Sequence, residues 1–495
     1  MTPDHLERKL GLWDATMLVA GSMIGSGIFI VSAEMARQVG SGYWLLFLWA
    51  FSGFLTLLAA LSYGELAGMM PQAGGQFVYI KKAFGNLPSF LYGWTVFSVI
   101  QTGVIAAVAM AFVKYTAVFF PQLSSEIKIF EWHGWSVNRA QAGAILLIIF
   151  LTGINSRGVN VGKWIQSVFT FSKVAALIAL VICGVWIGWD LNFWDLNFSG
   201  QWSASQTVWE KEVLTIEPLT GVALILALGT ASIGSLFSSD AWNNVTFIAG
   251  EIKNPEKNMP RSLILGVGGV CFLYFLANIA YLGILPLQGN PEGASMLEKG
   301  IQFAPSDRVG TSAAWMVFGD QAVWIMAGLI MVSTFGCNNG IIMAGARVYY
   351  AMSKEKLFFK TAGVLNKSGV PGKALIIQAI WASLLCLSGS YGALLDYTTF
   401  ASLIFYIITI AGIFVLRKKI PNHPRPYKVP FFPILPLIYI IFALIICIIL
   451  LITKPESTQA GLIIVLLGIP IYFITKLNKS NYHSNSYDHQ QKSDS

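Results

Sequence analysis

The sequence predicts an all-α membrane protein with about twelve transmembrane helices, and three observations support that fold class. Hydrophobic residues make up 55% of the 495 residues and charged residues only 11%, whereas a soluble chain carries about 25% charged residues. Apolar windows of about 20 residues, the length that crosses a bilayer, recur along the whole chain. Two of these windows are interrupted by short runs of small and polar residues.

The apolar windows divide the chain into segments. We expect a cytoplasmic N-terminus over residues 1–10, two repeats of five spans over residues 11–188 and 219–416, two further spans over residues 431–476, and a disordered cytoplasmic tail over residues 477–495. The individual spans are predicted at residues 11–36, 43–70, 89–120, 140–155, 165–188, 219–248, 263–285, 322–350, 373–389, 397–416, 431–452 and 457–476.

The positive charges are distributed unevenly along the chain. The formal net charge is +8, but Lys and Arg gather in alternate loops, while the other loops hold acids such as Asp190, Glu210 and Glu217. This positive-inside pattern predicts a multi-pass protein of the cell membrane (inner or plasma membrane) with both termini in the cytoplasm. The charge therefore reflects topology, so the expected partner is the lipid bilayer and no nucleic acid.

The first span contains the run Gly21-Ser22-Met23-Ile24-Gly25-Ser26-Gly27. Glycine and serine weaken a helix, and non-helical backbone inside a bilayer is tolerated only where it is buried in protein or lines a cavity. We therefore expect a broken helix. The amides of Gly25, Ser26 and Gly27, with the Ser26 hydroxyl, could hold a carboxylate. Carbonyls near Met23 and Ile24 could hold an ammonium group. Alternatively, the glycines only permit close helix packing.

The sixth span contains a second interruption, Gly234-Ser235-Leu236-Phe237-Ser238-Ser239-Asp240. The two interruptions are five spans apart, and an odd offset inverts the topology of the second half relative to the first. This arrangement is typical of transporters built from inverted repeats, whose site lies between two discontinuous helices. Carbonyls around Phe237 and Ser238 could join the ammonium site. Phe237 and Trp242 could close over a substrate, with ordinary aromatic packing as the alternative.

Two charged residues lie inside the spans. Lys173, in the fifth span, costs at least about 2.5 kcal/mol there and is expected to face a partner or a cavity. It could supply a fixed positive charge, titrate and couple transport to protons, or snorkel to the interface. Asp240 could pair with a cationic substrate, relay protons, or cap the following half-helix, and we favour capping. Glu65 and Lys114 lie near span ends, where we expect them at the interface.

The sequence offers little for catalysis, for a metal or for a cofactor. All five histidines lie outside the spans, and no pair of them has metal-ligand spacing on one helix. Neither a phosphate-binding loop nor a nucleophile elbow occurs. We therefore expect no enzyme activity, no metal and no cofactor. The polar residues of the eighth span are expected to hold helices together: Ser333, Thr334, Asn338 and Asn339.

Longer motifs flank both interruptions: Gly21-Ser22-Met23-Ile24-Gly25-Ser26-Gly27-Ile28-Phe29, Pro71-Gln72-Ala73-Gly74-Gly75, Phe237-Ser238-Ser239-Asp240-Ala241-Trp242-Asn243-Asn244, Gly250-Glu251-Ile252-Lys253-Asn254-Pro255 and Arg425-Pro426-Tyr427-Lys428-Val429-Pro430. Together they resemble the amino acid–polyamine–organocation superfamily, and most of all its L-type amino acid transporter branch. The resemblance covers residues 8–440.

This resemblance implies the leucine-transporter-type fold, in which two inverted repeats of five helices are followed by two further helices. It also implies amino acid transport by alternating access. Lys173 matches the fifth-helix lysine that takes the place of a sodium ion, so sodium independence is expected. By the same match Phe237 would be the aromatic gate, and four residues would border the side-chain pocket: Gln101, Gly103, Phe400 and Ser402.

Animal members of this branch pair with a glycoprotein heavy chain through a cysteine between spans three and four. Residues 121–139 contain no cysteine, so a free-standing, bacterial-type protein without a disulfide-linked heavy chain is expected. The resulting hypothesis is a sodium-independent exchanger of neutral or cationic L-amino acids. A proton-coupled amino acid symporter is the alternative mechanism, and an amino acid sensor or channel is the alternative from another class.

Overall fold

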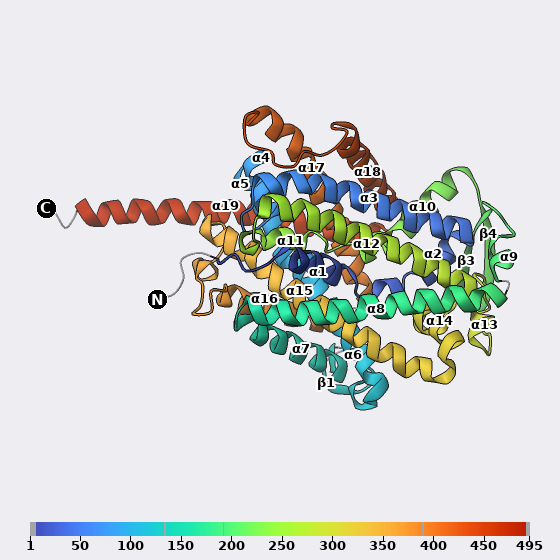
Figure 1. The fold of residues 1–495 in the computed structure, drawn as a ribbon. Helices are drawn as coiled ribbons and strands as arrows, with labels where there is room; N and C mark the ends of the chain where they lie inside the picture. Colours follow the sequence, from blue (N-terminus) through green and yellow to red (C-terminus); the bar gives the residue numbers. More distant parts are fainter. Residues whose placement is uncertain (1–5, 133–134, 192, 389–390, 492–495) are drawn as a thin grey trace.

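The computed structural model describes residues 6–132, 135–191, 193–388 and 391–491 of the chain. Long helices lie side by side and run between two ends of the molecule (Figure 1). Both ends of the chain lie at the same end of this bundle (Figure 1). We call this the terminal end of the bundle, and we call the opposite one the far end.

The first half of the chain forms α1 (Leu12–Met23), η1 (Gly27–Phe29), α2 (Ser32–Val39), α3 (Gly42–Met69), α4 (Gln76–Phe84), α5 (Asn86–Thr95), η2 (Val96–Ile100), α6 (Gln101–Phe119), η3 (Pro121–Leu123), β1 (Lys128–Trp132), β2 (Trp135–Asn138), α7 (Arg139–Ser156), α8 (Val159–Leu191), α9 (Phe193–Phe198), β3 (Ala204–Glu210) and β4 (Val213–Leu219). The second half forms α10 (Gly221–Ser238), α11 (Asn244–Phe247), η4 (Ala249–Glu251), α12 (Pro255–Ile284), α13 (Met296–Lys299), η5 (Pro305–Asp307), α14 (Val309–Phe318), η6 (Gly319–Gln321), α15 (Ala322–Lys354), η7 (Lys360–Gly363), α16 (Gly372–Ser388), α17 (Tyr391–Lys419), α18 (Ile434–Thr453) and α19 (Pro455–Gln491).

Ten helices of the described chain are long and apolar enough to cross a membrane. They match ten of the twelve predicted spans. The first predicted span is divided between α1 and α2, and each half is shorter than the roughly 20 residues that cross a bilayer. The ninth is α16, whose apolar part is the shorter helix Gly372–Leu387. The chain is therefore a multi-pass membrane protein of the all-α class, as the sequence predicts.

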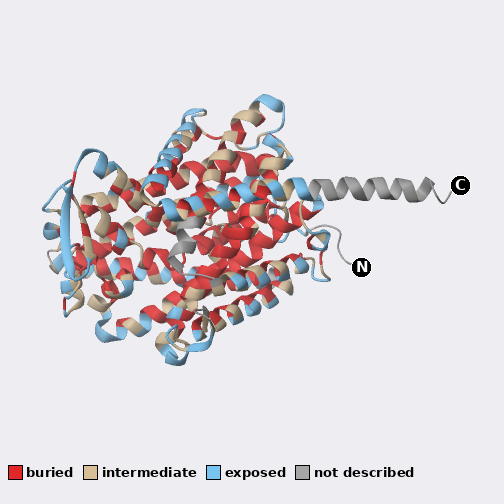
Figure 2. Cartoon of the chain, turned by 180° about the vertical axis from the view of Figure 1, so that it is seen from behind, coloured by how far each residue is buried: buried red, intermediate tan, exposed pale blue. Residues whose placement is uncertain are grey.

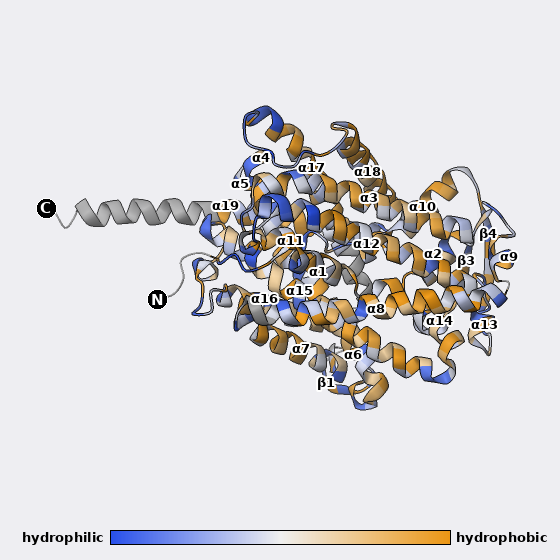
Figure 3. Ribbon diagram, in the orientation of Figure 1, coloured by the Kyte–Doolittle hydropathy of each residue, from blue (hydrophilic) through white to orange (hydrophobic). Residues whose placement is uncertain are grey.

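The broken first helix lies at the centre of the bundle. α1 packs against α8, α12 and α15, and α12 also packs along α3 while α15 packs along α6. Buried residues fill this interior (Figure 2). Large apolar side chains are nevertheless exposed on the outer helix faces, for example Phe150, Trp164, Trp186 and Phe272. Hydrophobic residues cover the lengths of the helices, and hydrophilic residues gather towards the two ends (Figure 3), as expected of a surface that lipid covers.

Two small hairpins interrupt the helical pattern. β1 pairs antiparallel with β2, and β3 pairs antiparallel with β4. The sequence analysis predicts neither hairpin. β2 leads directly into α7, which begins with a capping box: Asn138 Oδ1 accepts the Gln141 N–H at 2.9 Å, and Gln141 Oε1 accepts the Asn138 N–H at 2.9 Å. These reciprocal bonds satisfy two amide groups that a helix start leaves unpaired.

The last helix, α19, continues as far as Gln491. It therefore includes much of the segment 477–495, for which the composition predicts disorder. The structure describes no side-chain contact or exposure from residue 475 onward, so the expected disorder stays a prediction. The assignment of residues 11–188 and 219–416 to two repeats also stays a prediction.

Candidate substrate site between two broken helices

The first helix breaks where the sequence predicts. α1 ends at Met23, and helical structure resumes at Gly27. The backbone bonds across the gap resume with the Phe29 N–H, which donates to Ser26 O at 3.1 Å. Within the described chain, the N–H groups of Gly25 and Gly27 find no backbone acceptor. The break thus presents amide donors at the start of the far half-helix, where a helix dipole favours an anion.

The carbonyl groups at the end of α1 are satisfied by other helices. Lys173 Nζ donates to Gly21 O at 2.5 Å and to Ile24 O at 2.6 Å. Ser333 Oγ also donates to Ile24 O, at 3.0 Å. Tyr274 Oη donates to Met23 O at 3.0 Å. A carbonyl oxygen has two lone pairs, so Ile24 O has none left for the substrate ammonium group that the sequence analysis assigns to it.

Lys173 is 2% exposed. Its ammonium group lies between the carbonyls of the first break and also approaches Ser333 O at 3.4 Å. It does not reach the membrane interface, so the snorkelling interpretation is wrong. A buried ammonium group is stable only where hydrogen-bond acceptors replace water, and here the unwound end of α1 supplies them. Lys173 thus supplies hydrogen bonds to carbonyl groups that the unwound end of α1 leaves without a helical partner.

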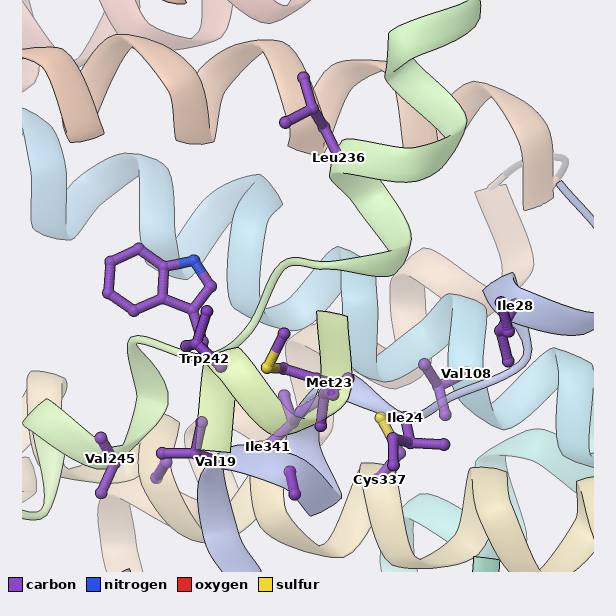
Figure 4. Close-up of a cluster of buried hydrophobic side chains, with 14 of the residues drawn as sticks. Val19, Met23, Ile24, Ile28, Val108, Leu236, Trp242, Val245, Cys337 and Ile341 are labelled. Atoms are coloured by element: carbon purple, nitrogen blue, oxygen red, sulfur yellow. The ribbon is translucent and has the colours of Figure 1, made fainter. Parts of the chain in front are cut away.

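The second helix breaks after Ser238, and the backbone hydrogen bonds at this break are made within the same segment. The Ser239 N–H donates to Ser235 O at 3.0 Å, and the Asp240 N–H donates to Phe237 O at 3.1 Å. Ala241 then adopts a positive φ of 64°, which turns the chain before α11 begins. Figure 4 shows the unwound segment between Leu236 and Trp242.

The two breaks contact each other. A Cβ atom added to Gly27 would overlap the Ser238 side chain and would lie 3.2 Å from Ser238 Cα. The absence of a side chain at Gly27 therefore permits the close approach of the two unwound segments. Close packing and a binding site are not exclusive here, because the same glycine provides both the contact and an N–H group without a backbone acceptor among the described residues.

Asp240 accepts a hydrogen bond from the Tyr406 hydroxyl. It does not cap α11, because the N-cap position belongs to Asn243 and no side chain caps that helix. The capping interpretation that the sequence favours is therefore wrong. No salt bridge of the described residues includes Asp240. Its carboxyl group is held by a neutral partner, and no cation of the described residues lies within ion-pairing distance of it.

Two cavities meet at Asp240. Each leaves about 20 Å³ of open space, room for a water-sized group, and we call the one that Gln101 lines the larger because more residues surround it. Both are lined by Asp240, Ser402 and Tyr406. The larger cavity is also lined by Gln101, whose Nε2 donates to Asn244 Oδ1 at 3.2 Å and to Ile341 O at 2.8 Å. Three of the predicted site residues, Gln101, Asp240 and Ser402, therefore lie around one polar cavity.

Other predicted residues lie beside this cavity and do not line it. Gly103 and Phe400 are buried in α6 and α17. Phe237 is half-buried at the end of α10. Trp242 is 2% exposed and packs in an aromatic cluster, with its ring 5.3 Å from that of Tyr406. Trp242 and Ser239 also line the smaller cavity, so the part of Trp242 in a gate stays a prediction. The lining of neither cavity includes residues of the first break: Ser22, Met23, Ile24, Gly25, Ser26 and Gly27.

The larger cavity contains residues that the sequence analysis did not select. Gln76 Nε2 and Tyr92 Oη are buried in its lining, and no hydrogen-bond partner for either is present in the described part of the chain. These residues come from α4 and α5, which are remote in sequence from both breaks. The remaining lining residues that were missed include Asn243, Asn244 and Phe405. Asn243 and Asn244 directly follow the second break, and that position is the one signal that could have identified them.

Three of the four polar residues predicted to hold α15 to its neighbours, Ser333, Asn338 and Asn339, connect elements as expected. Asn338 Nδ2 donates to Ile105 O at 3.3 Å, and Asn339 Nδ2 donates to Gly162 O at 3.1 Å. Thr334 bonds only within α15, through Ile330 O at 2.7 Å. These bonds tie α15 to α6 and α8, the same helices that border the first break.

Buried ion pairs close the terminal end of the bundle. Arg347 Nε lies 2.8 Å from Glu251 Oε1, and both side chains are at most 1% exposed. Glu65 is fully buried and pairs with Arg417 at 2.7 Å and with Arg425 at 3.4 Å. The expected interfacial position of Glu65 is therefore wrong. Charges that are paired and buried in this way hold packed elements in one arrangement.

Together these features define a class of protein. A multi-pass bundle holds two discontinuous helices in contact, with a buried lysine at one break and an acid beside a cavity at the other, which is the architecture of a membrane transporter. The family model described as amino acid permease matches residues 10–474. The chain therefore belongs to the amino acid permease family.

Three relatives illustrate the range of this family. The b(0,+)-type amino acid transporter 1 of Mus musculus is 28% identical over 476 residues, which cover 95% of this chain and 88% of the relative. The large neutral amino acids transporter small subunit 2 of Homo sapiens is 29% identical, with 95% and 80% covered. The serine/threonine exchanger SteT of Bacillus subtilis (strain 168) is 28% identical, with 96% and 98% covered. The family is one of transporters and not of enzymes.

Proposed function

We propose that this chain is a sodium-independent amino acid transporter that works by alternating access and exchanges one L-amino acid for another. The observation that carries the proposal is the position of Lys173. In transporters with broken helices, unwound carbonyls at a half-helix end coordinate the coupling cation. Here the Lys173 ammonium group takes the place of that cation and donates hydrogen bonds to Gly21 O and Ile24 O. A covalently attached cation leaves no need for a sodium ion at this position.

The substrate carboxylate is assigned to the first break. The N–H groups of Gly25 and Gly27 face no backbone acceptor among the described residues, and they lie at the start of a helical segment. Ser26 contributes its amide and hydroxyl to the same position. An anion at a helix start is favoured by both the hydrogen bonds and the helix dipole.

The substrate ammonium group is assigned to the second break. Ile24 O already accepts two protein donors, and Phe237 O accepts the Ser239 and Asp240 N–H groups, so the Ser238 carbonyl is the better partner. Ser238 packs directly against Gly27, so the groups assigned to the carboxylate and to the ammonium belong to neighbouring segments. Phe237, half-buried at the end of α10, is proposed as the aromatic gate over the bound substrate.

The substrate side chain is assigned to the cavity around Gln101, Asp240 and Ser402, which has about 20 Å³ of open space in this arrangement and must widen to admit it. The amide and hydroxyl groups there suit a neutral side chain. Asp240 has no ion pair in the described part of the chain, so it can also accept a cationic one. Neutral and cationic L-amino acids are therefore the proposed substrates.

The proposed orientation places the terminal end in the cytoplasm and the far end outside the cell. The loops at the terminal end hold most of the Lys and Arg residues, which supports this orientation. We also propose that the protein works without a disulfide-linked heavy chain. All five cysteines are free thiols, and residues 121–139 contain none.

Two other functions use the same site. A proton-coupled symporter is favoured by the unpaired Asp240 carboxyl group, which could load and release a proton with substrate. A sensor or channel would bind or conduct amino acids without exchange. Purified protein in proteoliposomes separates these functions, with a panel of labelled amino acids and with unlabelled amino acid inside or absent.

The exchanger predicts saturable uptake that requires internal amino acid and does not change when choline replaces sodium. Uptake into empty vesicles that follows an inward proton gradient would instead establish a symporter. A channel would equilibrate the label without requiring internal amino acid, and a sensor would give no uptake. Either of these last results would reject the proposal.

A further inference from the structure

A third cavity, larger than the two at Asp240, lies near the far end of the bundle, away from the proposed substrate site. It offers about 370 Å³ of open space between the last turns of α6, the segment after η3, the start of α7 and the start of α14. Its lining includes two cations, Lys114 and Arg308, and no acidic residue of the described chain. The cavity therefore has a positive charge that neither break accounts for.

The guanidinium group of Arg308 packs against an aromatic ring. It lies 4.9 Å from the centre of the Tyr115 ring. Its Nε is buried and has no hydrogen-bond partner among the described residues. A buried, unpaired guanidinium donor is costly, and a bound anion would satisfy it. The neighbouring acid is already engaged, since Asp307 pairs with Arg37 at 2.8 Å.

The rest of the lining sets the chemistry of the ligand. Ser124 and Ser125 add hydroxyl groups on one side, and the opposite walls are apolar, formed by residues such as Ile30, Met110 and Val118. Two cations suit a carboxylate. The apolar walls suit a hydrocarbon body, and the lining offers no carboxylate to a ligand ammonium group. The matching ligand is thus a small amphipathic monocarboxylate without an amino group.

We propose that this cavity, which we call the far-end cavity, binds an amphipathic monocarboxylate through Arg308 and Lys114. Ile30 lines the cavity and is the C-cap residue of η1, the first helical turn after the break in the first span. A ligand in the far-end cavity therefore contacts the half-helix that must move if the far side opens and closes. Occupancy from that side is expected to slow exchange, a consequence that rests on the proposed transport function.

The binding itself can be measured without transport. The probe is 3-phenylpropionate, with its uncharged amide as the matched ligand, titrated calorimetrically into the purified full-length protein. The acid should bind at least about tenfold more tightly than the amide, because the amide lacks the charge-assisted hydrogen bonds. Equal affinity for the acid and the amide would overturn the proposal.

Variants locate the bound acid. K114Q and R308Q should each weaken binding of the acid about tenfold, whereas K128Q should leave it within about twofold. Lys128 is the control because it lies in β1 and pairs with Glu131 in an exposed contact. Lys114 is itself exposed, so K114Q tests the cavity even if R308Q fails to fold. Unchanged affinity in K114Q would contradict the proposal.

The G27A variant distinguishes the far-end cavity from the substrate site. If the acid binds in the far-end cavity, G27A should weaken its binding less than K114Q does, because the added methyl group meets Ser238 and reaches the cavity only through the η1 turn that ends at Ile30. Loss of binding in G27A with normal binding in K114Q would place the acid at the first break and would overturn the proposal. If the acid slows exchange by the unmodified protein but not by K114Q, the binding result extends to transport.

Discussion

The two breaks occupy equivalent positions in the predicted repeats, yet they are stabilised in different ways. The first is held by distant helices: Lys173 of α8 and Ser333 of α15 donate to its carbonyls. The second is closed by its own neighbours, through Ser239 and Asp240 N–H groups that donate to Ser235 O and Phe237 O. The first break thus depends on the tertiary structure, whereas the second keeps its shape locally and leaves an acid facing a cavity. In the proposed assignment the first break holds the carboxylate that all substrates share, and the second also faces the cavity that would select their side chains.

The largest effect is expected from K173A. The variant removes a buried cation and the hydrogen bonds that it donates to Gly21 O and Ile24 O. Each group left unsatisfied costs about 1–3 kcal/mol of stability. Exchange should fall at least about 100-fold for every amino acid in the panel, and the thermal unfolding temperature should drop. The matched control is K163A on the same helix, where Lys163 forms a more exposed pair with Asp14 at 2.8 Å. Normal exchange in K173A would remove the proposed role of Lys173.

The next effect is expected from G27A, which tests the contact between the breaks. The added methyl group overlaps Ser238, and such overpacking costs about 1–3 kcal/mol. Exchange should fall about tenfold to 100-fold, and the double variant G27A/S238G should recover part of it. G153A is the control, because nothing lies within 4 Å of a Cβ at Gly153. Equal rates for G27A and G153A would show that the breaks need not touch.

A selective effect is expected from D240N, which keeps the shape of the side chain and removes its charge. A hydrogen bond to a charged group contributes about 1.5–3 kcal/mol, so cationic amino acids should lose about tenfold to 100-fold in kcat/KM. Neutral amino acids should change less than about threefold. Uptake kinetics for one amino acid of each class measure the difference. A uniform loss for both classes would mean that Asp240 is structural and that the second break does not select substrates.

The smallest effect is expected from Y406F. The variant removes the hydroxyl group that donates to Asp240 and keeps the ring that stacks on Trp242. Loss of one hydrogen bond should lower the free energy of unfolding by about 0.5–1.5 kcal/mol and change KM less than about fivefold. Denaturation in detergent and uptake kinetics check both values. An effect as large as that of D240N would mean that Tyr406 itself contacts the substrate.

Much of the fold follows from the sequence because lipid imposes strict rules. Apolar length predicts the spans, and glycine and serine inside an apolar window predict the breaks at Gly25 and Ser238. The sequence could not predict what satisfies the broken ends. Lys173 is 149 residues from Ile24 along the chain, and no local pattern relates the two.

The errors at Asp240 and Glu65 have the same physical origin. The position of Asp240 before a polar segment suggests a cap, but the left-handed turn at Ala241 delays α11 until Asn244 and directs the acid elsewhere. Glu65 lies near a span end, yet Arg417 and Arg425, more than 350 residues later in the chain, fold over it. Tertiary partners decide both positions, and a single sequence does not contain them as a local signal.

The account depends most directly on Lys173 acting in place of a sodium ion. Its direct test is the affinity of the purified protein for a transported amino acid, measured in sodium chloride and in choline chloride at equal ionic strength. The account predicts the same dissociation constant in both salts, because the Lys173 ammonium group already occupies the carbonyls of Gly21 and Ile24. Binding at least about tenfold tighter in sodium, a difference of about 1.4 kcal/mol, would contradict it.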